Sequence, residues 1–276
     1  MRPCLIIAWQ EIRDGLRNKW ILAAALLLSL FALSITHLGS APIGAVGASP
    51  LAVSIISLSS LTVFLLPLLG LLLSYDAVVG ENERGTLLLF LSYPLKRWQF
   101  LAGKFLGQCL IIVIAVLIGY GVSGALTVAG MERVSGAEIG AYLTMMASSV
   151  LLGAAFIAIG YVISVVVGQR GAAGGLALSV WLGFVLIYDT LLLGMIVGDE
   201  GSAISDRLFN VLLLLNPTDA YRLLNLTFLE DVSRHAGITD IAGAGSADLT
   251  QSLASMTLWI VIPFATAIAV FSKKEL

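Results

Sequence analysis

Charged side chains are scarce in this sequence: Asp, Glu, Lys and Arg make up 12% of the 276 residues, whereas hydrophobic residues make up 59%. A soluble domain of this length needs a polar shell around its core, so this composition excludes an ordinary soluble protein. Apolar runs of about 20 residues, the length that crosses a hydrocarbon core, recur along the chain. They are too long and too uniformly apolar for barrel strands. The sequence therefore predicts an all-α, polytopic membrane protein.

Cysteine and histidine are nearly absent, with two residues of each type. Cys4 lies in the N-terminal arm and Cys109 lies in an apolar run, so we expect no structural disulfide. His37 and His235 have no Cys or His nearby at the spacing of metal ligands. We therefore expect no metal site.

Sequence motifs for catalysis are also missing. No G-x-x-x-x-G-K-[ST] occurs, because Gly103 and Lys104 are followed by Phe105 and lack the earlier glycine. The apolar runs contain no pattern typical of an intramembrane serine protease or metalloprotease. We expect no catalytic residues and no bound cofactor in this chain, and no enzymatic activity of its own.

Six membrane spans can be placed, at residues 20–38, 53–75, 105–129, 141–167, 175–197 and 254–271. An even number of spans puts both termini on the same side of the membrane. Eleven of the 15 Lys and Arg residues then fall on the side of the termini, and four fall on the other side. By the positive-inside rule, both termini are predicted to be cytoplasmic.

The arm before the first span, residues 1–19, has the pattern of an amphipathic helix. Leu5, Trp9, Ile12 and Leu16 recur at spacings of three and four residues, with polar residues between them. We expect this helix to lie along the inner membrane interface, where a Trp ring can be partly hydrated. A simple anchor for the first span is the alternative.

The loop between the second and third spans, residues 76–99, begins with a short charged segment and continues with an apolar strip at residues 87–91. The pattern predicts a short helix along the membrane that is broken at Gly85. Its apolar strip can press into a groove on a cytosolic partner. The alternative is a solvated loop with snorkelling basic residues. The charged residues at its start are Asp76, Glu81, Glu83 and Arg84.

Residues 80–107, GENERGTLLLFLSYPLKRWQFLAGKFLG, resemble the E-x-E-R-G-T-L-x-x-L-L-S-x-P-x-x-R-x-x-x-L-x-G-K pattern of ABC-2 type permeases, the six-span membrane subunits of ATP-binding-cassette transporters. The resemblance implies one permease domain over residues 1–276 with a type V exporter-like fold. In that family, an interfacial connecting helix precedes the first span, and a cytoplasmic coupling helix between spans two and three sits on the ATPase. The residues that correspond to the coupling region are Glu81, Glu83, Arg84, Gly85 and Thr86.

The family also has an outer, partly re-entrant segment between spans five and six, which residues 198–253 resemble through LNPTDAYRLLNL at 215–226. This outer segment holds eight acidic and three basic residues. It suits either a docking surface for a partner or a plain solvated loop. The candidate contacts to a periplasmic partner are Asn216, Pro217, Asp219, Tyr221 and Arg222.

Asp189 lies in the outer half of the fifth predicted span. An ionisable group at the centre of a span costs about 2.5 to 3.5 kcal/mol on insertion scales unless it is paired or hydrated. Asp189 is therefore a candidate for a transport pathway. In the alternative, the span ends near Tyr188, and Asp189 caps a re-entrant helix that begins at residues 191–197.

Among ABC-2 permeases, the length, the arm and residues 74–94 are most similar to the permeases of transporters that mature the copper sites of nitrous oxide reductase. This resemblance implies a complex in the lipid of a bacterial inner membrane, without nucleic acid. Its expected parts are two permeases, two cytoplasmic ABC ATPases that bind ATP and Mg²⁺, and a periplasmic β-helical subunit.

The predicted function is to couple ATP hydrolysis by the separate ATPase to export, or to mechanical work on the periplasmic subunit. Two alternatives remain open: an exporter of another substrate, and a membrane scaffold that transports nothing. The sequence does not choose among copper, a sulfur species and no transported substrate.

Overall fold

The computed structural model of the chain describes residues 2–17, 28–34, 50–92, 95–131, 134–198, 206–235 and 249–274. Every regular element in these ranges is helical. Within them, five helical stretches are long and apolar enough to cross a membrane. The prediction of an all-α, polytopic membrane protein is thus confirmed.

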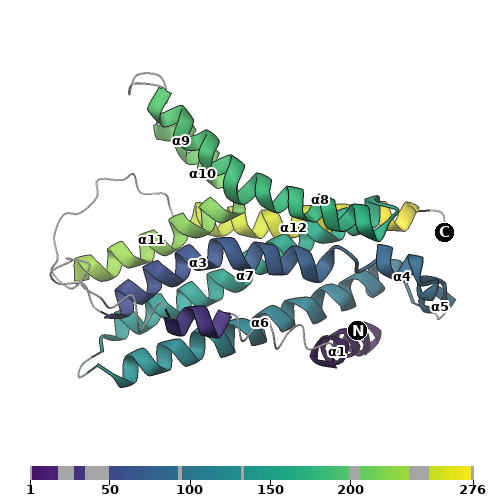
Figure 1. The fold of residues 1–276 in the computed structure, drawn as a ribbon, viewed down its shortest axis with the longest axis horizontal. Helices are drawn as coiled ribbons and strands as arrows, with labels where there is room; N and C mark the ends of the chain where they lie inside the picture. Colours follow the sequence, from purple (N-terminus) through teal and green to yellow (C-terminus); the bar gives the residue numbers. More distant parts are fainter. Residues whose placement is uncertain are drawn as a thin grey trace.

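The long helices run along the longest axis of the molecule (Figure 1). They are α3 (Pro50–Ser74), α6 (Arg97–Ala129), α7 (Gly136–Val166), α12 (Leu249–Lys273) and a bent fifth helix made of α8 (Arg170–Leu182), the π-helical η1 (Gly183–Ile187) and α9 (Tyr188–Gly198). Short amphipathic helices lie at the two ends of this bundle.

Helix α7 is the centre of the bundle. It packs against α3, α6, α11 and α12, and its apolar residues surround the helix, as expected for a helix that is buried on all sides. Small residues allow the closest approach: a Cβ atom on Gly70 of α3 would lie 2.8 Å from the carbonyl oxygen of Gly153. Only glycine fits at that crossing.

The second, fourth and sixth predicted spans agree with α3, α7 and α12 to within a few residues at each end. The third begins eight residues earlier than predicted, at Arg97. Lys104 lies just before the predicted third span, but α6 includes it in a buried, ion-paired position. The first predicted span lies largely outside the described residues; its residues 28–34 are helical.

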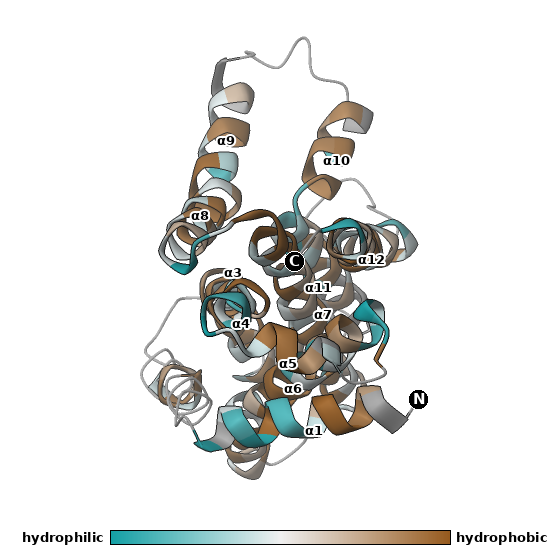
Figure 2. Ribbon diagram, turned by 90° about the vertical axis from the view of Figure 1, so that its right-hand side faces the viewer, coloured by the Kyte–Doolittle hydropathy of each residue, from teal (hydrophilic) through white to brown (hydrophobic). Residues whose placement is uncertain are grey.

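Helix α1 (Arg2–Arg17) lies across one end of the bundle, which we call the α1 end (Figures 1 and 2). Ile7 and Ala8 are buried, whereas Leu5, Ile6 and Trp9 are 64 to 70% exposed. The helix predicted for residues 1–19 is confirmed, and its outward apolar face is the one expected of a helix at a membrane interface.

Helices α4 (Val79–Glu83) and α5 (Thr86–Ser92) lie at the same end, where polar residues gather in Figure 2. The turn between them contains Gly85, whose φ is +70°. This left-handed backbone conformation is strained for residues with a Cβ atom, so glycine is favoured there. The predicted helix break at Gly85 is confirmed.

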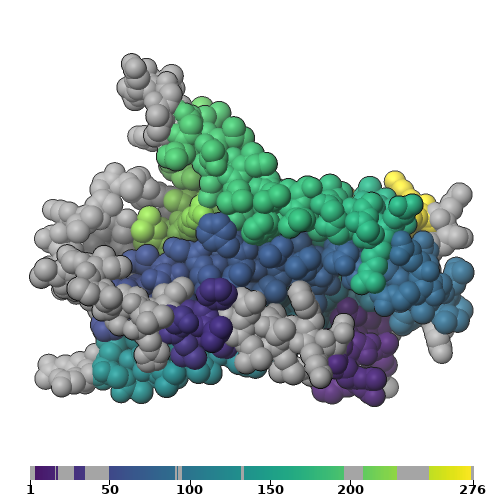
Figure 3. All heavy atoms as spheres, viewed as in Figure 1, coloured from purple at the N-terminus to yellow at the C-terminus, as the bar shows by residue number. Residues whose placement is uncertain are grey.

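Helix α9 bends away from the bundle, and α10 (Asp206–Leu214) accompanies it in a projection that Figure 3 shows in green. Helix α11 (Pro217–His235) then packs against α7 and α12. The helix continues through Asp189 to Gly198, so Asp189 does not cap a separate helix over residues 191–197. An ion pair to Arg222 compensates the charge of Asp189, so the helix has no need to end there.

Candidate functional site

The polar turn, residues 75–86, joins α3 to α5 and contains all five residues of the predicted coupling region. It is fixed to α7 by a buried side chain: Oγ of Ser164 accepts hydrogen bonds from the backbone N–H groups of Val78 (2.9 Å) and Val79 (3.1 Å). These N–H groups lie at the start of α4, where a helix supplies no acceptor of its own. The position of the turn is therefore tied to the central helix.

Glu81 and Thr86 bond to each other across the Gly85 break. The Thr86 hydroxyl contacts both the carboxylate of Glu81 and its backbone carbonyl oxygen, the latter at 3.1 Å. The same carboxylate pairs with Nζ of Lys104 at 3.1 Å. Two of the predicted coupling residues thus hold the turn in shape.

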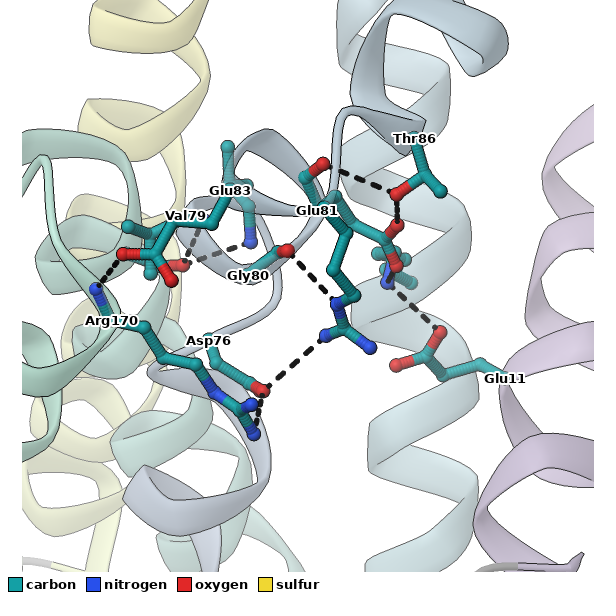
Figure 4. A network of polar contacts seen from close by, with 12 residues as sticks. Glu11, Asp76, Val79, Gly80, Glu81, Glu83, Thr86 and Arg170 are labelled. Carbon is teal, nitrogen blue, oxygen red and sulfur yellow. Dashed lines mark hydrogen bonds and ion pairs between the residues drawn. The ribbon is translucent and has the colours of Figure 1, made fainter.

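Glu83 and Arg84 connect the polar turn to the start of α8 (Figure 4). The carboxylate of Glu83 accepts the backbone N–H of Arg170 at 2.7 Å. Arg84 donates through Nε to the carbonyl oxygen of Gly80 at 2.9 Å. Asp76 lies between the two arginines, 2.9 Å from Arg170 and 3.7 Å from Arg84.

Sequence reasoning missed three members of this network as site residues: Asp76, Lys104 and Arg170. The sequence places Asp76 at the start of the loop 76–99, and it places Lys104 and Arg170 only as charges next to predicted spans. The usable signal was that all three flank spans on the side predicted to be cytoplasmic. Charges at the ends of neighbouring spans meet when the helices pack side by side, as they do here.

The surface next to the polar turn is apolar. Leu87 is buried, but Leu88 and Leu89 of α5 are 63% and 64% exposed, and Trp98 at the start of α6 is 48% exposed. Exposed large apolar side chains beside a polar segment are typical of an interaction surface. Of the predicted strip, Leu88 and Leu89 are the residues available to a partner.

Arg97 fastens the start of α6 to the C-terminal end of α12. Its Nη1 atom donates to the backbone carbonyl oxygens of Phe271 (3.0 Å), Ser272 (3.2 Å) and Lys274 (2.6 Å). Carbonyl groups at a helix C-terminus lack partners in the helix and favour a cation. The polar turn, α6 and α12 are consequently linked at the α1 end.

The five residues predicted to contact a periplasmic partner lie together at the start of α11, and four of them are buried. Asn216 precedes Pro217, the first residue of the helix, and its Oδ1 accepts the backbone N–H of Thr218 at 3.0 Å. Its Nδ2 donates to the carbonyl oxygen of Phe184 in η1 at 3.0 Å. Asn216 therefore both caps α11 and satisfies a carbonyl group of the π-helical segment.

Asp189, the predicted pathway residue, forms an ion pair with Arg222. Nη1 of Arg222 lies 2.6 Å from Oδ2 of Asp189 and 2.9 Å from Oδ1 of Asp219. Burial raises the pKa of the Asp219 carboxyl to about 6; the nearby Asp189 adds to this rise, while Arg222 and Asn216 oppose it. The predicted pathway residue Asp189 is thus ion-paired with Arg222. Its role in a pathway stays a prediction.

A cavity of about 370 Å³ lies beside this ion pair, between α3 and the α10–α11 segment. Asp219, Arg222, Asn225 and Ser59 are among its lining residues. Tyr221 itself points into the bundle, where its hydroxyl is 3.1 Å from Oγ of Ser149. Among the described residues of the outer segment, the side chains of Asn216, Asp219 and Arg222 bond to other groups of the chain.

Among the described residues, no group of three or more His, Cys, Asp or Glu side chains could hold a metal ion. His37 lies outside these residues.

The bundle and its polar end define a polytopic membrane protein, and sequence comparison gives its family. The chain matches the model of the ABC-2 family transporter protein over residues 5–276. It is 45% identical over 276 residues to the probable ABC transporter permease protein NosY of Stutzerimonas stutzeri, with 97% of each chain covered. It is 42% identical over 271 residues to the protein of the same name from Pseudomonas aeruginosa, with 98% of each chain covered.

This chain therefore belongs to the ABC-2 family of transporter proteins. It is a permease, the non-catalytic membrane component of an ABC transporter, and the class implies partner ATPase subunits. The family predicted from residues 80–107 is confirmed.

Proposed function

We propose that this chain is the NosY-type permease of a transporter that serves copper-site maturation of nitrous oxide reductase. The observation that supports this role most strongly is similarity over nearly the whole length to two probable NosY permeases. The transporter couples ATP hydrolysis by a separate cytoplasmic ATPase to export, or to mechanical work on a periplasmic partner. ATP and Mg²⁺ bind to that ATPase.

In this proposal, the α1 end faces the cytoplasm of a bacterium, and both termini lie there. The excess of Lys and Arg on that side supports the orientation. Residues 20–38 supply the first of six spans, and α1 before it is the connecting helix. Residues 76–99 are the coupling loop, and residues 198–253 are the re-entrant outer segment of a single permease domain.

The coupling loop acts on the ATPase through α5. Its polar side chains and the backbone N–H of Val78 bond to α6, α7 and α8. These bonds make the conformation of the loop rigid. Leu88 and Leu89 offer the exposed apolar contact. A displacement of α5 by the ATPase then passes through the polar turn into the spans.

The assembly proposed for this permease contains two copies of the chain, two ATPase subunits and a periplasmic β-helical subunit. The projection of α9 and α10 is the part of the chain that stands off the bundle at the opposite end (Figure 3). It and the partly exposed Arg222 form the surface proposed to meet the periplasmic subunit, because the other predicted contacts are buried.

A complementation experiment tests the proposal. A strain that lacks this chain should produce nitrous oxide reductase with incomplete copper sites, and the intact chain should restore them. The double variant Leu88→Ser, Leu89→Ser should abolish restoration and ATP hydrolysis by the purified complex. Leu143→Ser is the matched control, because Leu143 is equally exposed on α7 near the opposite end. Complete copper sites in the deletion strain would refute the assigned function.

A further inference from the structure

Lys104 is a cation inside the protein. It belongs to α6, its side chain is only 8% exposed, and its Nζ atom lies between the carboxylates of Glu11 (3.3 Å) and Glu81 (3.1 Å). Lysine is almost never buried unless it is paired, because removing an ammonium group from water costs several kcal/mol. Both partners are therefore needed to keep this charge in place.

The two carboxylates come from different parts of the chain. Glu81 belongs to α4 in the polar turn, and Glu11 belongs to α1 (Figure 4). The other acid close to the turn, Asp76, is already engaged by Arg84 and Arg170. Lys104 thus joins three elements, α1, α4 and α6, through one ammonium group.

Helix α1 packs closely against α6. A Cβ atom on Gly103 would lie 2.7 Å from Cβ of Ile7, and one on Gly107 would lie 2.7 Å from Cβ of Glu11. The Gly-x-x-x-Gly spacing therefore makes the groove into which α1 fits. One turn beyond Lys104, Gln108 donates to Oε1 of Glu11 at 2.9 Å, so that this carboxylate is held from two sides.

We propose that Lys104 is a positioning residue that makes α1 and the polar turn move as one unit with the start of α6. The inference rests on the proposed coupling function and extends it: a push on the polar turn reaches α1 and the third span together. Without Lys104, the turn keeps its bonds to α7 and α8 but loses its tie to α1.

Two pairs of spin labels test this inference in the assembled complex of permease, ATPase and periplasmic subunit. The first pair, at the exposed residues Gln10 and Asn82, reports the distance between α1 and the polar turn. The second pair, at Asn82 of one permease copy and Asn82 of the other, reports movement of the turns between the two copies of the proposed assembly. Distances are measured without nucleotide and with a non-hydrolysable ATP analogue.

We expect the Asn82–Asn82 distance between the two copies to change with nucleotide while the Gln10–Asn82 distance stays constant. If both distances change, α1 and the turn move separately and the inference is overturned. If the Asn82–Asn82 distance is the same in both states, the proposed coupling function fails. These measurements keep all the native side chains of the network, so they do not depend on whether a variant folds.

A variant in which the whole network is uncharged distinguishes a positioning role of Lys104 from a role in stability alone. In the triple variant Glu11→Gln, Lys104→Met, Glu81→Gln, no buried charge is left unpaired, so assembly of the complex should persist. We expect ATP hydrolysis driven by the permease to fall about tenfold and the Gln10–Asn82 distance to broaden, because the ammonium bridge is gone. Lys273→Met, which removes an exposed charge at the same end, is the control. Normal coupling in the triple variant would refute the role of Lys104.

Discussion

The two ends of this permease use the same charge arrangement, one cation between two carboxylates, for different purposes. At the α1 end, Lys104 is 8% exposed and pairs with Glu11 and Glu81. In the outer segment, Arg222 is 38% exposed and pairs with Asp189 and Asp219. The cation of the first cluster is covered by protein, although its carboxylates line a cavity of about 440 Å³. The cation of the second cluster is partly exposed at the surface.

The difference lies in what each cation connects. Lys104 joins three helices that are separate in the sequence, but Arg222 has one partner on its own helix, three residues away. Arg222 therefore links just α11 and α9. The comparison indicates that Lys104 holds α1, α4 and α6 rigidly together, whereas Arg222 holds α9 and α11 together less strongly.

The largest effect is expected for Lys104→Met. This change leaves two carboxylates without their buried cation, and removing one member of a buried pair costs about 3 to 5 kcal/mol. We expect a strong loss of folded permease, measured as the midpoint of thermal unfolding of the purified complex. A midpoint equal to that of Lys273→Met would contradict the enclosed character of this cluster.

A smaller effect is expected for Arg222→Met, because water already screens part of this cation. The expected loss is about 1 to 2 kcal/mol, measured on the same unfolding curves. A loss as large as that of Lys104→Met would show that the greater exposure of Arg222 does not weaken its ion pairs, and would contradict the contrast between the two ends.

Asn216→Ala tests the contact between α11 and η1. The variant removes a helix cap and the hydrogen bond from Nδ2 to the carbonyl oxygen of Phe184, a change that we expect to cost about 1 to 2 kcal/mol. Hydrogen–deuterium exchange should become faster in residues 184–188 and at the start of α11. Unchanged exchange in both places would mean that Asn216 does not fasten the two segments.

The smallest effect is expected for Gly85→Ala, which forces a Cβ atom into a backbone with φ of +70° at an exposed position. The expected cost is about 1 kcal/mol. Gly175→Ala is the matched control, because Gly175 lies within α8 and a Cβ atom there meets no atom within 4 Å. Equal stability of the two variants would contradict the strained turn.

The sequence predicted the helices whose apolar patterns are long, because a bilayer imposes their length. It also predicted the break at Gly85, where glycine marks a backbone that other residues avoid. The spacing of Gly103 and Gly107 predicts a close helix contact, but it does not identify α1 as the helix that packs there.

What the sequence did not predict depends on packing between distant segments. Lys104 was read as a loop charge because its two partners are not its neighbours in the sequence. The π-helical η1 has no sequence signal of its own, and its contact with Asn216 joins residues that are 32 positions apart. The acids and polar residues of the outer segment suggested an outward surface, yet most of those proposed as contacts are buried.

The central claim is that α5 and the polar turn face the cytoplasm and receive the motion of the ATPase. Single cysteines at Asn82 and Leu88, in a chain with Cys4 and Cys109 replaced by Ser, test it most directly by cross-linking to the ATPase in native membranes. The account predicts cross-links from Leu88 that depend on nucleotide, and labelling of Asn82 by an impermeant maleimide from the cytoplasmic side. Labelling of Asn82 from the periplasmic side alone would contradict it.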